Sequence, residues 1–472
     1  MKRIHLIVPA ALLVLSLLSH CSSDVGGTTP EPEIERPPVS DVACSDCDFV
    51  IEPGVGMIDG EKLGIQPGQV IGLSGSGENY QNITFTNIVG TEADPIIIRN
   101  CDGKAIIESY YAFGVKFTHS EHFRLLGDGD VASDYGIQIS TSKGFFLTLE
   151  QFTTDFDISL VEIAGYEPRG IGENNGFAGI GIKTSPYQAC DVFTDPTRSA
   201  WIMKNVSVSH CYIHDTGGEG LYIGHGFYEG RVESACSETT YSHSIQHIRI
   251  HDNRIEDVGF DGIQIKNCDK DCKVFNNVIR NYGQLDEGAH NEGLFIGDGT
   301  TGEFYGNYII NGTGHGIQFY GIGNNDIYNN LIVNAGNGPD KKGDGFYAAN
   351  AVRWEDGYFN VMNNTFINSG RNGLAFFGVD GGVKRFYNNI FAVTGAELSR
   401  KGVAMDSANN IFTQNLESLH FSNPDKEDYS LQDGSRALDA GADVSMYGID
   451  VDILGQSRPV GTAYDVGAYE KR

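Results

Sequence analysis

The sequence has few prolines, few tryptophans and few basic residues. Only 14 of its 472 residues are proline and 2 are tryptophan, whereas 61 are glycine and 40% are hydrophobic. This composition excludes a collagen-like or proline-rich disordered chain and is sufficient for a packed interior. The 33 basic and 62 acidic residues give a net charge of −29, which disfavours nucleic acid and anionic membrane surfaces because both need a basic protein surface. We expect a globular monomer without a nucleic-acid partner.

A long apolar run occurs only near the N-terminus, at residues 4–18, and it is too short to span a membrane. We expect residues 1–20 to be a signal peptide. The stretch Leu18-Ser19-His20-Cys21 resembles a bacterial lipoprotein signal, which implies that Cys21 is lipidated. Residues 21–40 then form a flexible tether. The expected location is an outer-membrane lipoprotein, on the periplasmic or cell-surface side, that contacts the membrane only through its lipid; ordinary secretion is the alternative.

The cysteines lack the paired Cys-x-x-Cys sets with suitable histidine spacing that a structural zinc site needs. Without Cys21 they number eight, and an even number in an exported chain permits disulfides. The pairs that we expect are Cys44 with Cys47, Cys190 with Cys236, and Cys268 with Cys272.

Helical periodicity is missing from about residue 130 onward, and two phrases of alternating apolar residues take its place. The first phrase, Gly-apolar-x-apolar, begins at Gly136, Gly179, Gly220, Gly262, Gly293, Gly316, Gly345 and Gly373. The second phrase begins at Asn253, Asn277, Asn307, Asn330, Asn364 and Asn389. Each unit therefore contains at least two short strands separated by Gly, Asn and Asp turns.

The repeat length decides between a propeller and a parallel β-helix. A propeller blade needs about 40 residues and four antiparallel strands, whereas an interval as short as the 23 residues from Gly293 to Gly316 fits one β-helical turn. We expect stacked turns about 4.8 Å apart, in which each phrase becomes a column and many asparagines form ladders.

Residues 130–395 resemble right-handed parallel β-helix repeat proteins of the pectate-lyase-like superfamily. Residues 65–71 and 90–99 resemble the opening turns of secreted members, and the tail at 428–470 resembles their recurring C-terminal segment. This resemblance implies an all-β fold, with one right-handed parallel β-helix over 41–472, a C-terminal capping segment at about 396–472 and long loops on one side. It leaves the reaction open, because the architecture hosts lyases, hydrolases, epimerases and inert surface proteins.

Alternation along the strand predicts that the second residue after each glycine points outward. These residues are Gln138, Gly181, Tyr222, Gln264, Phe295, Gln318, Tyr347 and Ala375. Amides and aromatic rings on one strip suit contact with sugar rings, and a merely solvated sheet face is the alternative. Among them we select Tyr222 and Gln264 as candidate substrate-binding residues.

The residue before the glycine is Glu219, Asp261 and Glu292 on three consecutive turns. Carboxylates about 5 Å apart repel unless a cation or a shared proton compensates. They could be the acid and base of a glycosidase, or Asp261 and Glu292 could bind Ca²⁺, the only cofactor that we expect. The alternative is a structural column that hydrogen-bonds turn amides.

Lys183 and Lys266 share a further column, and Lys266 follows Asp261 by five residues. In uronic-acid lyases a basic group removes the C5 proton. Residues 259–266 resemble the acid-to-lysine stretch of alginate and chondroitin lyases and the calcium stretch of one pectate lyase family, although Gln264 stands where the latter has another Asp. Residues 291–297 supply neither the Arg of the first group nor the Lys of the second.

The largest insertions, at residues 141–177, 184–208 and 225–247, surround the turns that carry these residues, and such loops on a rigid scaffold often carry function. They lie near His225 and His290, and His315 extends the acidic column. With Lys183, these histidines are candidate substrate-binding residues.

These observations predict a polysaccharide-degrading enzyme and slightly favour a lyase in which Lys266 is the base. In that version Asp261 and Glu292 hold Ca²⁺ or position the base. A glycoside hydrolase that uses Glu219, Asp261 and Glu292 is the first alternative. A noncatalytic glycan-binding or adhesive surface rod is the second.

Overall fold

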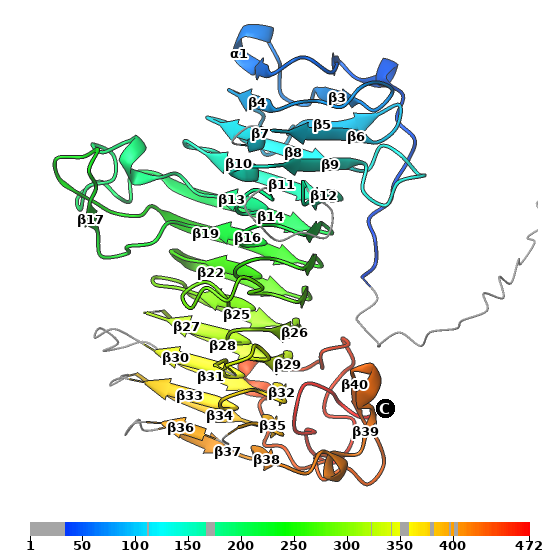
Figure 1. Cartoon of the computed structure of the whole chain (residues 1–472), viewed down its shortest axis with the longest axis vertical. Helices are drawn as coiled ribbons and strands as arrows, with labels where there is room; N and C mark the ends of the chain where they lie inside the picture. Colours follow the sequence, from blue (N-terminus) through cyan, green and yellow to red (C-terminus); the bar gives the residue numbers. More distant parts are fainter. Residues whose placement is uncertain are drawn as a thin grey trace, which may run out of the picture.

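The computed structural model describes residues 34–110, 113–166, 175–321, 323–340, 342–349, 358–377, 382–395, 398–400 and 405–472. The expected signal peptide, Cys21 and most of the expected tether lie outside the described residues. Over the described residues the chain is a right-handed parallel β-helix whose N-terminal and C-terminal coils lie at opposite ends of the long axis (Figure 1). The predicted fold class is therefore confirmed.

Three parallel sheets form the walls of the β-helix, and successive strands of a sheet come from successive coils. Sheet A consists of β1 (Phe49–Ile51), β3 (Val70–Ser74), β5 (Ile96–Cys101), β8 (Glu121–Leu126), β11 (Thr154–Ser159), β14 (Ile202–Ser209), β19 (Ser244–His251), β22 (Cys268–Phe275), β25 (Gly302–Tyr305), β28 (Asn325–Tyr328), β31 (Phe359–Met362), β34 (Lys384–Tyr387) and β37 (Asp406–Ala408). Sheet B consists of β2 (Met57–Asp59), β4 (Ile83–Thr86), β7 (Phe113–Thr118), β10 (Phe145–Glu150), β13 (Ile180–Ile182), β16 (Leu221–Ile223), β21 (Ile263–Ile265), β24 (Leu294–Ile296), β27 (Ile317–Tyr320), β30 (Phe346–Ala349), β33 (Leu374–Phe377) and β36 (Leu398–Arg400). Sheet C consists of β6 (Ala105–Ser109), β9 (Ile137–Thr141), β12 (Val161–Ala164), β15 (Tyr212–His214), β20 (Arg254–Glu256), β23 (Val278–Arg280), β26 (Tyr308–Gly312), β29 (Leu331–Ala335), β32 (Thr365–Ile367), β35 (Ile390–Ala392) and β38 (Ile411–Thr413).

Helical structure is confined to short turns. The helix α1 (Gly60–Leu63) lies at the N-terminal end of the solenoid, and the 3-10 turns are η1 (Cys44–Asp46), η2 (Pro186–Gln188), η3 (Leu416–Leu419), η4 (Pro424–Lys426) and η5 (Ser445–Tyr447). Among the described residues, none of these helices is long and apolar enough to cross a membrane.

Seven of the eight glycine phrases form consecutive strands of sheet B. Their first and third apolar residues face the interior as predicted; Ile263 and Ile265 of β21, for example, are fully buried. The Gly136 phrase is the exception, because it forms β9 of sheet C, and β10 takes the corresponding place in sheet B. Gln138 therefore does not belong to the outward strip.

The outward strip of sheet B is less exposed than the alternation predicts. Tyr222, Gln318 and Tyr347 keep part of their surface accessible, whereas Gln264 is fully buried and Phe295 is 7% exposed. Neighbouring side chains cause this burial, since the ammonium of Lys266 lies 4.7 Å from the ring centre of Phe295. The strip is thus partly covered from outside the solenoid.

The asparagine phrase forms the predicted ladder, just before the strands of sheet C. The amide of Asn277 donates to Asn307 Oδ1 at 3.0 Å, and the amide of Asn307 donates to Asn330 Oδ1 at 2.9 Å. The same amide of Asn307 donates to the carbonyl of Val274 at 3.0 Å. Each fully buried asparagine thus satisfies both its neighbour and a turn carbonyl.

The segment after β38 returns along the solenoid and covers the lower part of sheet C (Figure 1). It contains the antiparallel pair β39 (Phe421–Asn423) and β40 (Asp428–Leu431). Its apolar residues, such as Leu419, Tyr429 and Tyr469, form one buried cluster with outward residues of sheet C, among them Tyr308 and Leu331. One face of the β-helix is therefore closed to ligands there, while sheet B stays open.

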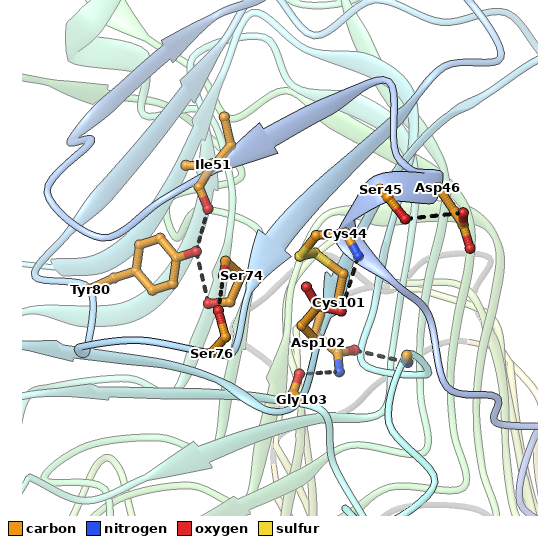
Figure 2. The surroundings of a disulfide bond; sticks show 12 residues. Cys44, Ser45, Asp46, Ile51, Ser74, Ser76, Tyr80, Cys101, Asp102 and Gly103 are labelled. Carbon is orange, nitrogen blue, oxygen red and sulfur yellow. Dashed lines mark hydrogen bonds between the residues drawn. A yellow bond between two sulfur atoms is a disulfide. The ribbon is translucent and has the colours of Figure 1, made fainter.

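The described residues contain two disulfides, and one matches the prediction. Cys190 pairs with Cys236 in the loop that projects beside β17 (Arg231–Val232) and β18 (Thr239–Thr240). Cys44 pairs with Cys101, so the predicted Cys44–Cys47 bond is wrong (Figure 2). Cys44 is the first residue of the turn η1 and lies next to Cys101 at the end of β5. The prediction was wrong because it paired cysteines that are close in sequence. The predicted Cys268–Cys272 bond is also wrong, because both are buried free thiols.

Candidate active site

Glu219, Asp261 and Glu292 lie in one column at the entry of strands β16, β21 and β24 of sheet B, as the repeat predicts. The strand register places Tyr222 beside Gln264 and Gln264 beside Phe295, which fixes the three turns next to one another. All three carboxylates are buried, with residue exposures of 0%, 0% and 2%. Main-chain bonds tie the turns together, such as Gly262 N–H donating to the Glu292 carbonyl at 2.9 Å.

The three carboxylates differ in their hydrogen bonds. Asp261 Oδ1 accepts the Glu292 N–H at 2.9 Å, and Glu292 Oε2 accepts the Asn291 N–H at 3.0 Å. Within the part of the chain that the structure describes, both Glu219 oxygens and Asp261 Oδ2 lack a hydrogen-bond partner. An unsatisfied buried carboxylate is costly, so this column is not explained by turn stabilisation alone.

Burial also changes the acidity of the column. It raises the pKa of Glu219 to about 6, against the opposing influence of its own backbone amide, Lys183 and Lys266. Burial, and then the neighbouring Glu292, raise the pKa of Asp261 well above its usual range. Protons or a cation must therefore compensate the column near neutral pH.

Lys183 and Lys266 lie at the exits of β13 and β21, in one column as predicted. The Lys183 ammonium is 3.6 Å from the ring centre of Tyr222, and the Lys266 ammonium lies over Phe295. Burial lowers the pKa of Lys183 to about 8, and it also lowers the pKa of Lys266. Both amines are half-buried, and that of Lys266 lies over Phe295 of the outward strip, whereas Glu219 and Asp261 are fully buried.

The three predicted histidines lie at different places. His290 Nδ1 is 3.6 Å from Glu219 Oε1, and its side chain is 43% exposed. His225 is half-buried with Nδ1 near the Gly226 carbonyl, and burial lowers the pKa of His225. His315 Nδ1 accepts the Asp344 N–H at 3.0 Å, and its ring stacks on Tyr347 at 4.4 Å. Among these three, only His290 has a ring nitrogen near Glu219, whereas His315 occupies the next place in the column as predicted, because the Gly293 N–H donates to its carbonyl at 2.9 Å.

The Gln264 side chain is fully buried beneath the lysines and aromatic rings. It faces the Tyr222 hydroxyl but neither of its polar atoms forms a hydrogen bond of ordinary geometry. Gln264 is therefore in place to orient Tyr222, not to contact a polymer itself.

A groove of about 660 Å³ runs along sheet B from the end of the acidic column toward β33. Its aromatic lining consists of Phe295, Tyr320, Tyr347 and Phe377, and its polar lining includes Glu292, His315, Gln318, Lys342 and Arg371. A larger cavity of about 770 Å³ lies against the C-terminal segment, between residues such as Tyr305 and Glu470. The smaller groove is the better candidate, because the acidic column opens into it.

Arg371 is a groove residue that the sequence analysis missed. Its guanidinium binds Asp344 through both oxygens, with Nε 3.0 Å from Oδ1. Burial alone would raise the pKa of Asp344, but His315 and Arg371 hold it below its usual range. The sequence does place Arg371 two residues before a repeat glycine, Gly373. A single arginine in a turn does not, however, indicate which acidic residue it will pair with.

Glu219, Asp261 and His290 form a group that could hold a metal ion, because their ligand atoms all lie within 4.8 Å of one another. The expected calcium pair was Asp261 with Glu292. In the structure Asp261 Oδ1 and Glu292 Oε2 accept backbone N–H groups, and the third member of the group is an imidazole. Ca²⁺ takes six to eight oxygen ligands, so this donor set does not fit it well.

The arrangement places amines above buried acids and beside an aromatic groove. Amines with lowered pKa can accept protons, and charged ones can bind carboxylates. Glu219 and Asp261 are fully buried and can hold a cation or tune the amines, whereas Glu292 lines the groove.

The comparisons with known proteins agree with the fold. A family model described as "Right handed beta helix region" matches residues 204–391. Solved structures to which the chain is similar include pectate lyase Pel9A (12% identity, 94% of this chain and 99% of that chain, TM-score 0.47), an alginate lyase from Paenibacillus sp. (15%, 77% and 99%, 0.40) and a GH136 lacto-N-biosidase from Eubacterium ramulus (12%, 74% and 62%, 0.46). No curated protein matches the sequence. The family model matches less than half of the chain, and the described residues have the fold of a right-handed parallel β-helix.

Proposed function

We propose that this protein is an exported polysaccharide lyase that cleaves uronic-acid-containing glycans by β-elimination. The observation that supports this most is the division of the site into two layers. The outer layer consists of Lys183, Lys266 and His290, all at least partly accessible, and the inner layer consists of carboxylates that expose almost no surface. Lys266 contacts Phe295, which lines the groove, so a polymer bound there would lie near this amine.

In this reaction the neutral amine of Lys266 takes the C5 proton of the uronate. The electron pair of the C5–H bond forms the C4–C5 double bond, the C4–O glycosidic bond breaks, and the departing oxygen is protonated. We choose Lys266 as the base because its ammonium lies over Phe295, a groove residue; burial lowers the pKa of Lys266 and so favours its neutral form.

Substrate binding uses the length of the groove. Aromatic rings at Tyr347 and Phe377 offer flat faces for sugar rings. Arg371 and Lys342 pair with Asp344 and Asp340, so a uronate carboxylate would compete with these acids for their positive charge. Lys183, two coils from Lys266 or about 10 Å, can bind a further carboxylate and supply local positive charge in a chain of net charge −29.

A glycoside hydrolase remains the alternative for the same groove, with Glu219, Asp261 and Glu292 as acid and base. That mechanism needs carboxylates in contact with the glycosidic bond and a neighbouring water. Glu219 and Asp261 are fully buried, and this burial is the reason to rank the hydrolase second.

The proposed function also includes export by the signal peptide and lipidation at Cys21.

Variants at Lys266 test the lyase. The mature chain is incubated with a panel of uronate polymers while the ultraviolet absorbance of unsaturated ends is recorded. We expect Lys266→Met and Lys266→Arg to abolish the signal, the second because arginine stays protonated. Lys270→Ala is the matched control, since Lys270 is exposed on sheet A, and it should retain full activity. Unchanged activity of both Lys266 variants would contradict the assignment.

A further inference from the structure

The pocket between Glu219, Asp261 and His290 has the marks of an ion site. The Glu219 side chain is fully buried, both of its oxygens lack hydrogen-bond partners, and Asp261 Oδ2 and His290 Nδ1 are likewise without partners. One ligand atom from each of the three residues lies within 4.8 Å of the other two. Buried polar atoms are normally hydrogen-bonded, and no described protein donor serves these oxygens, so the three side chains have free ligand capacity directed at one another.

We infer that Glu219, Asp261 and His290 bind a divalent transition-metal ion of the zinc class, and not calcium. One imidazole nitrogen and two carboxylates are a donor set typical of catalytic zinc sites, which have three protein ligands and one open position. Calcium is a hard cation that avoids imidazole and needs more oxygen ligands than this pocket supplies.

The geometry agrees with a small ion. Ligands about 2.1 Å from a tetrahedral ion lie roughly 3.4 Å apart, and His290 Nδ1 lies 3.6 Å from Glu219 Oε1. Asp261 is also held for this role, because the Glu292 N–H occupies Oδ1 and leaves only Oδ2 free. The half-exposed imidazole provides a path from solvent, so the ion can enter the finished fold.

The ion would also balance the charge of the column. Three buried carboxyl groups lie close together in a low-dielectric interior, where protons or a cation must compensate their charge. A divalent cation compensates two of the negative charges and places positive charge beside the groove, close to Lys266. This role does not depend on which reaction the groove carries out.

Metal titration of the full mature chain tests the inference. The chain is stripped with a chelator and titrated with Zn²⁺, Mn²⁺ and Ca²⁺ by isothermal titration calorimetry, and with Co²⁺ while visible absorption is recorded. We expect one equivalent of Zn²⁺, a visible Co²⁺ spectrum of low coordination number, and weaker binding of Ca²⁺. His290→Ala and Glu219→Gln should each lose the bound equivalent and the Co²⁺ spectrum.

The control is His420→Asn, which removes an exposed histidine at a left-handed turn (φ 42°) where asparagine is tolerated. It should bind like the wild type. If Glu219→Gln fails to fold, His290→Ala decides, since its side chain is half-exposed. Absence of stoichiometric Zn²⁺ in the folded wild type, binding that survives His290→Ala, or tighter binding of Ca²⁺ would each overturn the inference. The titration uses no substrate. A negative result would therefore overturn the metal site without contradicting the lyase proposal.

Discussion

The ammonium of Lys183 lies 3.6 Å from the ring centre of Tyr222, which comes from the next coil of the β-helix. This cation–π contact holds the amine at the surface of sheet B, two coils from Lys266 in the same column. Its burial is what gives it a pKa of about 8. Lys183 is therefore charged at neutral pH and loses its charge in mildly alkaline solution.

The first prediction is a pH dependence of substrate binding. Because the pKa of Lys183 is lowered to about 8, its positive charge is present below that pH and lost above it. We expect KM for an anionic uronate polymer to rise above pH 8. Lys183→Arg should remove this rise, since arginine stays charged. A KM that rises equally in Lys183→Arg would assign the effect to another group.

The second prediction concerns the aromatic part of the groove. Tyr347→Ala should weaken polymer binding without moving its pH dependence, because the ring supplies a flat apolar face and not charge. We expect a loss of about 1 kcal/mol in binding, or about a fivefold rise in KM. Tyr187→Ala, at an exposed ring in the large insertion, is the control and should bind normally. A changed pH profile in Tyr347→Ala would show that the ring acts through a charged neighbour.

The third prediction concerns the asparagine ladder. Asn307→Ala removes the donor to Val274 and Asn330 and the acceptor for Asn277. Each buried group left without a partner costs about 1–3 kcal/mol, so we expect the free energy of unfolding to fall by about 3 kcal/mol or more. Thermal unfolding measures this. The exposed Asn337 supplies the control, and Asn337→Ala should change stability by less than about 0.5 kcal/mol.

The fourth prediction concerns the disulfide between Cys44 and Cys101, which are 57 residues apart (Figure 2). Its loss in Cys101→Ser should lower the free energy of unfolding by about 4 kcal/mol, because the bond closes a long loop in the unfolded chain. Cys47→Ser is the matched control, since Cys47 is a free, half-buried thiol, and it should keep native stability. Peptide mapping without reduction should find Cys44 linked to Cys101. A Cys44–Cys47 peptide would contradict the structure.

The sequence predicts the fold well because the β-helix is a local repeat. The strand after Gly262 pairs with strands from neighbouring coils that carry the same phrase, and the buried amide of Asn307 bonds to asparagines at the equivalent place in those coils. The repeat of the phrase therefore predicts both contacts. The single failure within the repeat, Gly136, lies where a long coil allows another segment, β10, to take the place in sheet B. Local pattern alone cannot distinguish the three sheets of one coil.

The candidate site is less predictable because its contacts cross between loops. The column Glu219, Asp261 and Glu292 follows from the repeat, but the approach of His290 to Glu219 depends on how the turn before β24 folds. The contact between Arg371 and Asp344 likewise depends on how two separate turns fold. The Cys44–Cys101 bond shows the same limit, since its partners meet only after the first coils have stacked.

The mass of the products tests the central claim most directly. A uronate polymer is digested by the wild-type chain in heavy-oxygen water, and the oligosaccharides are analysed by mass spectrometry. Elimination predicts products that contain a C4–C5 double bond, are lighter by one water than hydrolysis products, and carry no heavy oxygen at the cleaved bond. Saturated products with one heavy oxygen at each new reducing end would contradict the lyase and establish the hydrolase.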